Sequence, residues 1–231
     1  MDLNALKSNL RSILDRATAA ASRAGRGADS VRLVAVTKTV TADVAKALAD
    51  FGAADLGENR VQDLLDKKAA LAGKAIRWHM IGHLQTNKVK KVIGEVALIH
   101  SVDSLRLAEE IESAAERIGV VQDVLLEVNV SGEESKSGLA PGETHDVAAS
   151  LRAFSNVRVL GLMTMAPIVD NPEDTRGVFR GLRELADAIA LDGCFAGARY
   201  ELSMGMTQDF EIAVEEGATL IRVGSALFHG V

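Results

Sequence analysis

The chain has 231 residues, a single cysteine and a formal net charge of -6 at pH 7. No Pro-rich, Gly/Ser-rich or highly charged stretch divides it, so we expect one domain over residues 1–231, and the acidic balance argues against nucleic-acid or anionic-membrane partners. Cys194 alone excludes an internal disulfide framework, and no apolar run approaches the ~20 residues of a membrane helix, so a soluble, cytoplasmic protein is expected.

The first predicted element is an amphipathic helix within residues 1–28. Its apolar residues recur at helical spacing: Leu3, Leu6, Leu10, Ile13, Leu14 and Ala17. The segment also carries the arginines and serines typical of a transit peptide. The interspersed acids Asp2 and Asp15 favour instead a helix packed on the domain.

Eight short β-rich runs follow: Val31 to Lys38, Asp55 to Asn59, Arg77 to Gly82, Leu98 to Asp103, Asp123 to Val130, Val157 to Met165, Tyr200 to Met206 and Thr219 to Ser225. Helical patterns separate most of them. Thr41 is a predicted N-cap, Asn171 precedes a helix over 178–190, and a helix near 87–93 is short. Alternating strands and helices predict an α/β fold with a parallel sheet. Eight units in this length match a single-domain (β/α)8 TIM barrel with an extra N-terminal helix, and a doubly wound sheet is the alternative.

Polar residues accumulate at or just past the carboxyl ends of these strands, the edge where barrel active sites are assembled. They are Lys38, Glu58, Asn59, His83, Asp103, Asn129, Thr164, Ser203 and Ser225. Polar residues also gather wherever strands turn into loops, which is the competing interpretation. Four methionines are expected to pack the barrel interior: Met163, Met165, Met204 and Met206.

Lys38 ends the apolar run VRLVAVTK. Because side chains alternate along a strand, Val34, Val36 and Lys38 share one side, and the amine is expected inside the barrel mouth. A dehydrated amine there can attack an aldehyde and form a Schiff base. The alternative is a lysine that extends from the strand tip into solvent.

Two glycine-bearing strand ends, in YELSMGMT and TLIRVGS, lie where many barrels hold a phosphate. They offer hydroxyl groups and close backbone approach through Ser203, Gly205, Gly224 and Ser225. Asp209 and Glu211 would repel a phosphate, so the eighth-strand loop and the serine hydroxyls are expected to contribute most. Glycines that merely serve tight turns are the alternative. A lysine opposite such loops predicts a pocket for a phosphorylated aldehyde, with pyridoxal 5'-phosphate as the candidate cofactor.

Three further residues are weaker candidates. Arg222 shares the side of Gly224 and could face the cofactor's pyridine nitrogen, or form an outward ion pair with a covering helix. Asn59 could hydrogen-bond the cofactor ring or cap the following helix, and His83 could carry a proton or be structural. No histidine, cysteine and carboxylate set has metal-ligand spacing.

With these residues in view, the chain resembles the pyridoxal phosphate homeostasis protein family. The shared motifs occur in the family's order across nearly the whole chain: AVTK, LGENRVQD, WHMIGHLQTNK, HSVDS, EVNVSGEESKSG, GLMTMAP, LSMGMTQDF and RVGSALFHG. The resemblance implies the barrel otherwise found as the N-terminal domain of alanine racemase, with Lys38 as the internal-aldimine lysine and Asn59 beside the ring. It also implies that Arg222 faces the pyridine nitrogen, and that the phosphate is held by Ser203, Gly224 and Ser225.

Other positions of the family pattern bear on cofactor exchange. Thr207 stands where serine is usual, which keeps the hydroxyl group. Lys136 and Lys88 match family positions and could act as second amines in exchange; ordinary surface lysines are the alternative.

The prediction is therefore a protein that holds pyridoxal phosphate as a Schiff base and serves its intracellular homeostasis and supply. Apo pyridoxal phosphate-dependent enzymes are candidate recipients, a monomer is expected, and robust catalysis is not. Racemase and decarboxylase relatives take a tyrosine or a cysteine from a second domain, and the sequence ends at Val231 without one. Tyr200 lies roughly 10 Å before Ser203 on its strand, towards the opposite rim.

Two alternative functions share the barrel lysine. One is a pyridoxal phosphate-dependent amino-acid racemase whose second base is water or His83. The other is a Schiff-base aldolase without a cofactor, which leaves the phosphate-type loops and Arg222 less well explained.

Overall fold

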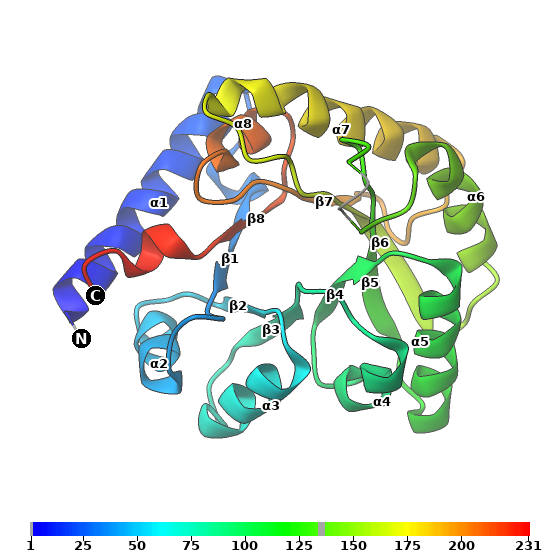
Figure 1. Cartoon of the computed structure of the whole chain (residues 1–231), viewed down its shortest axis with the longest axis horizontal. Helices are drawn as coiled ribbons and strands as arrows, with labels where there is room; N and C mark the ends of the chain where they lie inside the picture. Colours follow the sequence, from blue (N-terminus) through cyan, green and yellow to red (C-terminus); the bar gives the residue numbers. More distant parts are fainter. Residues whose placement is uncertain (1, 134–136) are drawn as a thin grey trace.

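The computed structural model describes residues 2–133 and 137–231, and its eight parallel strands close into a barrel in sequential order (Figure 1). The strands are β1 (Arg32–Val36), β2 (Asp55–Glu58), β3 (Arg77–Met80), β4 (Leu98–Val102), β5 (Gln122–Glu127), β6 (Val157–Met163), β7 (Glu201–Ser203) and β8 (Leu220–Val223). Direct pairing of β1 with β8 closes the sheet, so the predicted barrel is confirmed over the doubly wound alternative.

Helices surround the strands on the outside (Figure 1). The α-helices are α1 (Leu3–Arg23), α2 (Ala42–Asp50), α3 (Val61–Ala70), α4 (Val89–Val92), α5 (Leu105–Ile118), α6 (Pro141–Leu151), α7 (Arg176–Leu191) and α8 (Phe210–Glu215). Short 3-10 turns are η1 (Ala28–Ser30), η2 (Thr86–Lys88), η3 (Pro172–Thr175) and η4 (Ser225–Phe228). The short helix expected after β3 is confirmed as η2 and α4. No helix within the described residues is both long and apolar enough to cross a membrane.

The core has two parts, as the alternation of strand side chains requires. A large cluster fills the layer between strands and helices, and a small one fills the barrel lumen with Val34, Leu98, Leu125, Met163 and Leu220. The expectation that four methionines pack the interior is wrong for three of them, since Met206 is half-buried and belongs to neither cluster. Met204 belongs to the outer layer, because its strand neighbour Ser203 takes the inward position, and Met165 is 38% exposed beyond the end of β6.

Helix α1 packs on the barrel next to α8 and the C-terminal turn η4 (Figure 1). Asp2 caps it by accepting from the backbone N–H groups of Asn4 and Ala5. The Nδ2 group of Asn9 donates to the carbonyl oxygens of Leu227 and His229, at 3.1 and 2.9 Å. These bonds join both ends of the chain, as the predicted docked helix requires.

A buried ion pair fixes the mouth ends of β1 and β2. The Nζ of Lys67, on α3, donates to Glu58 Oε1 and to the carbonyl oxygen of Thr37, each at 2.6 Å. The Thr37 hydroxyl donates to the same carboxylate oxygen, also at 2.6 Å. Because Thr37 and Glu58 immediately precede Lys38 and Asn59, this cluster fixes the backbone positions of those two residues at the mouth.

We predict that Lys67→Met lowers the free energy of unfolding by roughly 3–5 kcal/mol, because it leaves the buried Glu58 carboxylate without its cation. Urea unfolding followed by circular dichroism measures the loss. The matched control is Lys68→Met, which removes an exposed pair with Glu95 and is expected to cost at most about 1 kcal/mol. Equal losses for the two variants would contradict the role given to Lys67.

Candidate functional site

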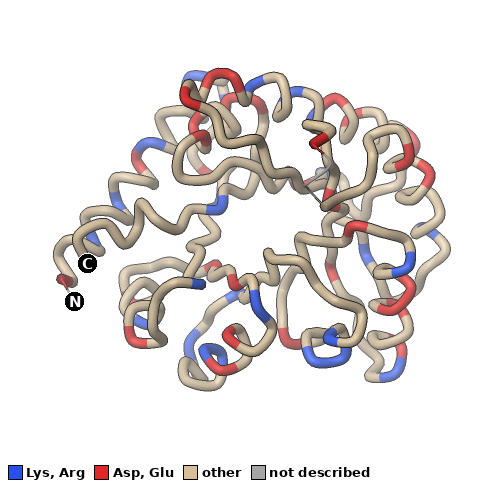
Figure 2. Tube along the Cα trace, in the orientation of Figure 1, with Lys and Arg blue, Asp and Glu red and all other residues tan. Residues whose placement is uncertain are grey.

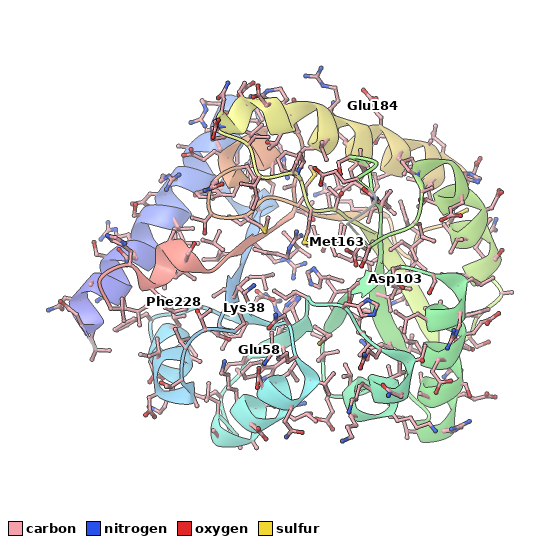
Figure 3. All side chains as sticks on the ribbon, in the orientation of Figure 1. Lys38, Glu58, Asp103, Met163, Glu184 and Phe228 are labelled. Atoms are coloured by element: carbon pink, nitrogen blue, oxygen red, sulfur yellow. The ribbon has the colours of Figure 1, made fainter. Side chains whose placement is uncertain are left out.

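Lys38 lies at the mouth of the barrel, directly after β1. Val34 faces the lumen, so alternation through Val36 directs Lys38 towards the mouth. Figure 3 shows Lys38 and Asp103 on the inner side of the molecule, whereas Glu184 projects from the outer face of α7. Within the described residues the Lys38 ammonium is exposed and has no hydrogen-bond or ion-pair partner. The predicted nucleophile is therefore free to react.

Asn59 lies between the mouth and a cavity formed by the loops after β2 and β3. Gly82 packs so closely on it that an added Cβ would come within 2.4 Å of the Asn59 carbonyl oxygen. Glycine is required there for close approach of the two backbones. His83 and Lys88 line the same cavity, which has a volume of about 340 Å³. Lys136, the other predicted exchange lysine, lies outside the described residues.

The two predicted phosphate loops meet at the mouth. The Ser225 hydroxyl donates to Thr207 Oγ1 at 3.1 Å, which joins the loop after β8 to the loop after β7. A Cβ added to Gly224 would lie 3.3 Å from Val36, so the loop after β8 rests on the end of β1. This contact places the hydroxyl pair of Ser225 and Thr207 beside the strand that carries Lys38.

Ser203 and Arg222 come together inside the lumen, one level below these loops. Arg222 donates from Nη1 to Ser203 Oγ at 2.7 Å and from Nη2 to the carbonyl oxygen of Thr164 at 2.9 Å. Ser203 is fully buried, and burial lowers the pKa of Arg222 to about 10, so the guanidinium keeps its charge at neutral pH. The inward orientation predicted for Arg222 is what the structure shows, and an outward ion pair is excluded.

A chain of hydrogen bonds continues from Ser203 down the lumen. Ser203 Oγ lies 2.8 Å from His100 Nδ1, and His100 Nε2 lies 2.9 Å from His79 Nδ1. His79 Nε2 lies 2.8 Å from Asp55 Oδ1. Burial raises the pKa of Asp55, but the hydrogen bonds from His79 and Arg77 outweigh burial and hold it below its ordinary value. The chain therefore ends on a carboxylate.

With both histidines neutral, only one assignment of the protons satisfies every bond. Asp55 can only accept, so His79 carries its proton on Nε2 and accepts at Nδ1. His100 then donates from Nε2 and accepts the Ser203 hydroxyl proton at Nδ1. Burial, with the positive charge of Arg222, holds the pKa of His100 well below its ordinary value. The Ser203 proton is thus donated inward, and the hydroxyl positions Arg222.

Glu127 is a buried carboxyl group that faces the mouth from β5. It is 4% exposed, its side chain has no hydrogen-bond partner within the described residues, and it follows the lumen residue Leu125 by two positions. Burial and the nearby charge of Asp103 raise its pKa to about 6, against the opposing charges of Arg222 and His83. His83 Nδ1 contacts Asp103 Oδ2 at 3.1 Å, with a side chain that is 58% exposed.

Sequence reasoning did not select three residues that contribute to this site, His79, His100 and Glu127, and it noted Thr207 only as a family position that keeps a hydroxyl group. The first three carried a signal, because each is a polar residue at an inward position of a predicted strand. Tyr200 and Cys194 lie before β7, at the end of the barrel away from Lys38. Within the described parts of the chain, no group of His, Cys, Asp and Glu side chains is arranged to hold a metal ion.

The arrangement suits a compact anion that also carries an electrophilic carbon. A free amine and a pair of hydroxyl groups share one mouth, and a fixed guanidinium lies beneath them. The amine can attack the carbon, while the hydroxyl groups and backbone of the two loops can bind the anionic group.

Comparisons with known proteins agree with this fold. The family model for the N-terminal domain of alanine racemase matches residues 1–230. The pyridoxal phosphate homeostasis protein of Aquifex aeolicus is 47% identical over 219 residues, covering 95% of each chain. A structure of an unknown protein from Bifidobacterium adolescentis aligns with a TM-score of 0.92 and 40% identity, covering 98% of this chain and 95% of the other. PipY of Synechococcus elongatus, solved with pyridoxal phosphate bound, aligns with a TM-score of 0.83 and 32% identity. The alignment covers 96% of this chain and 99% of the PipY chain.

Glu127→Gln is expected to change the pH dependence of stability. Because the folded-state pKa is raised from 4.5 to about 6, the stability that this group contributes is present below pH 4.5 and is lost as the pH rises through 6. The variant should match the wild type near pH 4.5 and exceed it by about 2 kcal/mol at pH 7.5. Urea unfolding at both pH values measures the difference, and a difference that does not vary with pH would contradict the assignment.

The proton assignment in the lumen is open to nitrogen NMR. We predict that at pH 7.5 both His79 and His100 carry their proton on Nε2, and that His100 resists protonation on acidification because burial lowers its pKa. Imidazole nitrogen shifts distinguish the two tautomers, and the exposed His229 serves as a solvent-accessible reference signal. A proton on Nδ1 of His100 would reverse the direction of the chain.

Proposed function

Because the chain belongs to the family of pyridoxal phosphate homeostasis proteins and carries the alanine racemase N-terminal domain, we propose that it holds pyridoxal 5'-phosphate reversibly and supplies it to other proteins. In this proposal residues 1–231 act as one cofactor-holding domain without robust catalysis of their own. Recipients would be apo forms of pyridoxal phosphate-dependent enzymes. The observation that carries the proposal is the free Lys38 amine at the same mouth as the joined loops of Ser225 and Thr207.

The residues at the mouth fit this cofactor chemically. Bound pyridoxal phosphate supplies an aldehyde carbon that amines attack and an aromatic ring that withdraws electrons. Lys38 Nζ would form a covalent bond to that carbon with loss of water, and the Asn59 side chain would lie beside the ring. Gly224, Ser225 and Thr207 would hold the phosphate. Ser203, which sequence reasoning assigned to the phosphate, would act through its hydrogen bond to Arg222.

The position of Arg222 supports holding over catalysis. A guanidinium with a pKa of about 10 remains a hydrogen-bond donor at neutral pH, so a ring nitrogen beside it would stay unprotonated. An unprotonated ring withdraws electrons weakly, which disfavours carbanion chemistry. Ser203 and the Thr164 carbonyl oxygen fix the guanidinium, so it cannot turn away.

The positions of the two candidate second bases, Tyr200 and His83, also support holding over racemisation. Racemisation gains roughly 10²–10⁴-fold from a second acid or base across the substrate. The Tyr200 hydroxyl donates to Asp187 of α7 at 2.5 Å and lies at the amino end of β7. His83, the other base considered, is mostly exposed and contacts Asp103.

We expect the protein to turn yellow with pyridoxal phosphate, and borohydride reduction to fix the cofactor to Lys38. Mass spectrometry of the digested protein locates the adduct. Lys38→Arg should abolish the adduct, whereas the matched Lys90→Arg, at an exposed position of α4, should keep it. A colourless protein, or an adduct that survives in Lys38→Arg, would overturn the proposal.

Two assays separate a carrier from an enzyme. Loaded protein should restore activity to an apoenzyme that depends on pyridoxal phosphate, and this transfer should fail with Lys38→Arg. With single-enantiomer alanine, serine or lysine, inversion should not exceed that of the free cofactor. Inversion well above that background would favour the racemase alternative.

A further inference from the structure

The cavity beside the barrel mouth shares only Asn59 with the residues that the cofactor proposal uses. It measures about 340 Å³ and is lined by Asn59, Arg60, Val61, Gln62, His83, Gln85, Lys88 and Lys91. These residues come from the start of α3 and from the segment of η2 and α4, so the cavity lies outside the ring of strands. We call it the rim cavity.

Three cations line the rim cavity without any counter-charge. Among the residues that the structure describes, Arg60, Lys88 and Lys91 form neither ion pairs nor side-chain hydrogen bonds. Figure 2 shows much of the α4 segment in blue. Like charges gathered in this way repel one another, and the whole chain carries a net charge of -6 that could have neutralised them. The cluster is thus not explained by folding.

The neighbouring carboxylates have partners of their own. Glu58 binds Lys67, and Asp66 accepts a hydrogen bond from Gln62 Nε2 at 2.8 Å. Asp103 contacts His83. Asp63, in the first turn of α3, does not line the cavity. None of these carboxylates lines the rim cavity, whose wall carries only positive charge among the residues that the structure describes.

Backbone donors add to the three cations. The residue before α3 is Arg60, whose side chain cannot accept, so the helix starts without a side-chain cap. Val61 and Gln62, in the first turn of α3, line the cavity, and their N–H groups have no acceptor within the described residues. Free N–H groups at a helix start favour an anion, and here they supplement the unpaired cations of the cavity wall.

We propose that the rim cavity binds a small phosphate monoester, as a site separate from the barrel mouth. Arg60 suits a phosphate because its planar guanidinium can donate twice, and Lys88 and Lys91 add point charges. The amide oxygens of Asn59 and Gln85 can accept from hydroxyl groups of the ligand. A volume near the lower limit of ligand pockets restricts the ligand to a compact metabolite.

Phosphate binding measured by calorimetry at low salt tests the proposal. Inorganic phosphate is the probe, and Arg60→Gln and Lys91→Gln should each weaken its binding about tenfold. Lys91→Arg, which keeps the charge, should weaken it less than threefold. The matched control is Lys90→Gln, which removes the same charge from α4 outside the cavity and should change binding less than twofold.

Further measurements distinguish phosphate binding at the rim cavity from binding at the barrel mouth. Ser225→Ala should leave phosphate binding at the rim cavity unchanged, and protein loaded with pyridoxal phosphate should still bind inorganic phosphate. The inference does not depend on the cofactor proposal, because Arg60→Gln should leave the reducible adduct at Lys38 intact. Undetectable phosphate binding, equal losses with Lys90→Gln, or loss only with Ser225→Ala would each overturn it.

Discussion

Arg222 is a buried charge at the centre of the barrel, and satisfying it organises the polar half of the lumen. An unpaired ion there would cost several kcal/mol. The charges of Glu127 and Asp209 act on it directly, and a chain of hydrogen-bonded neutral groups leads from it to the carboxylate of Asp55. Each neutral group donates its hydrogen bond in the same direction, towards Asp55, so its dipole is favourable to both charges. The guanidinium is thus held by a network with a single low-energy arrangement.

The packing of the lumen also determines where a ligand can bind. The lumen below is closed by apolar residues such as Val34 and Leu220, so a ligand can enter only at the carboxyl ends of the strands. Two strand ends are pinned by the buried pair of Lys67 and Glu58, and two others are joined by the loop contact between Ser225 and Thr207. The amine of Lys38 is therefore unpaired, within the described residues, on a rigid base, which is what the proposed bonding and release of a cofactor would need.

Sequence patterns predicted the elements well because their causes are local. Alternation of apolar residues defines β1 and the side on which Lys38 lies, and eight repeated units leave few ways to close a sheet. The contacts of Ser203 could not be predicted from the sequence, because they depend on which residues of β4 and β8 lie at the same height in the lumen once the barrel is closed. The same is true of His79 and His100: each is visible as an inward polar residue, but their pairing needs the shear of the closed barrel.

Charges left without partners are the clearest difference between what folding needs and what this protein contains. The outer helices satisfy most of theirs, as Arg176 does by binding three glutamates. Glu127 is buried and forms no ion pair within the described residues. Its raised pKa means that keeping this carboxyl group ionised lowers the stability of the fold. Arg60 and its lysine neighbours repel one another at the rim cavity. Glu127 lies on β5 and the cations follow β2 and β3, so the two sets have opposite sign and the field favours an anion at the rim cavity over one beside Glu127. Since selection for stability alone would remove the cation cluster, we attribute it to the anionic ligand proposed for the rim cavity.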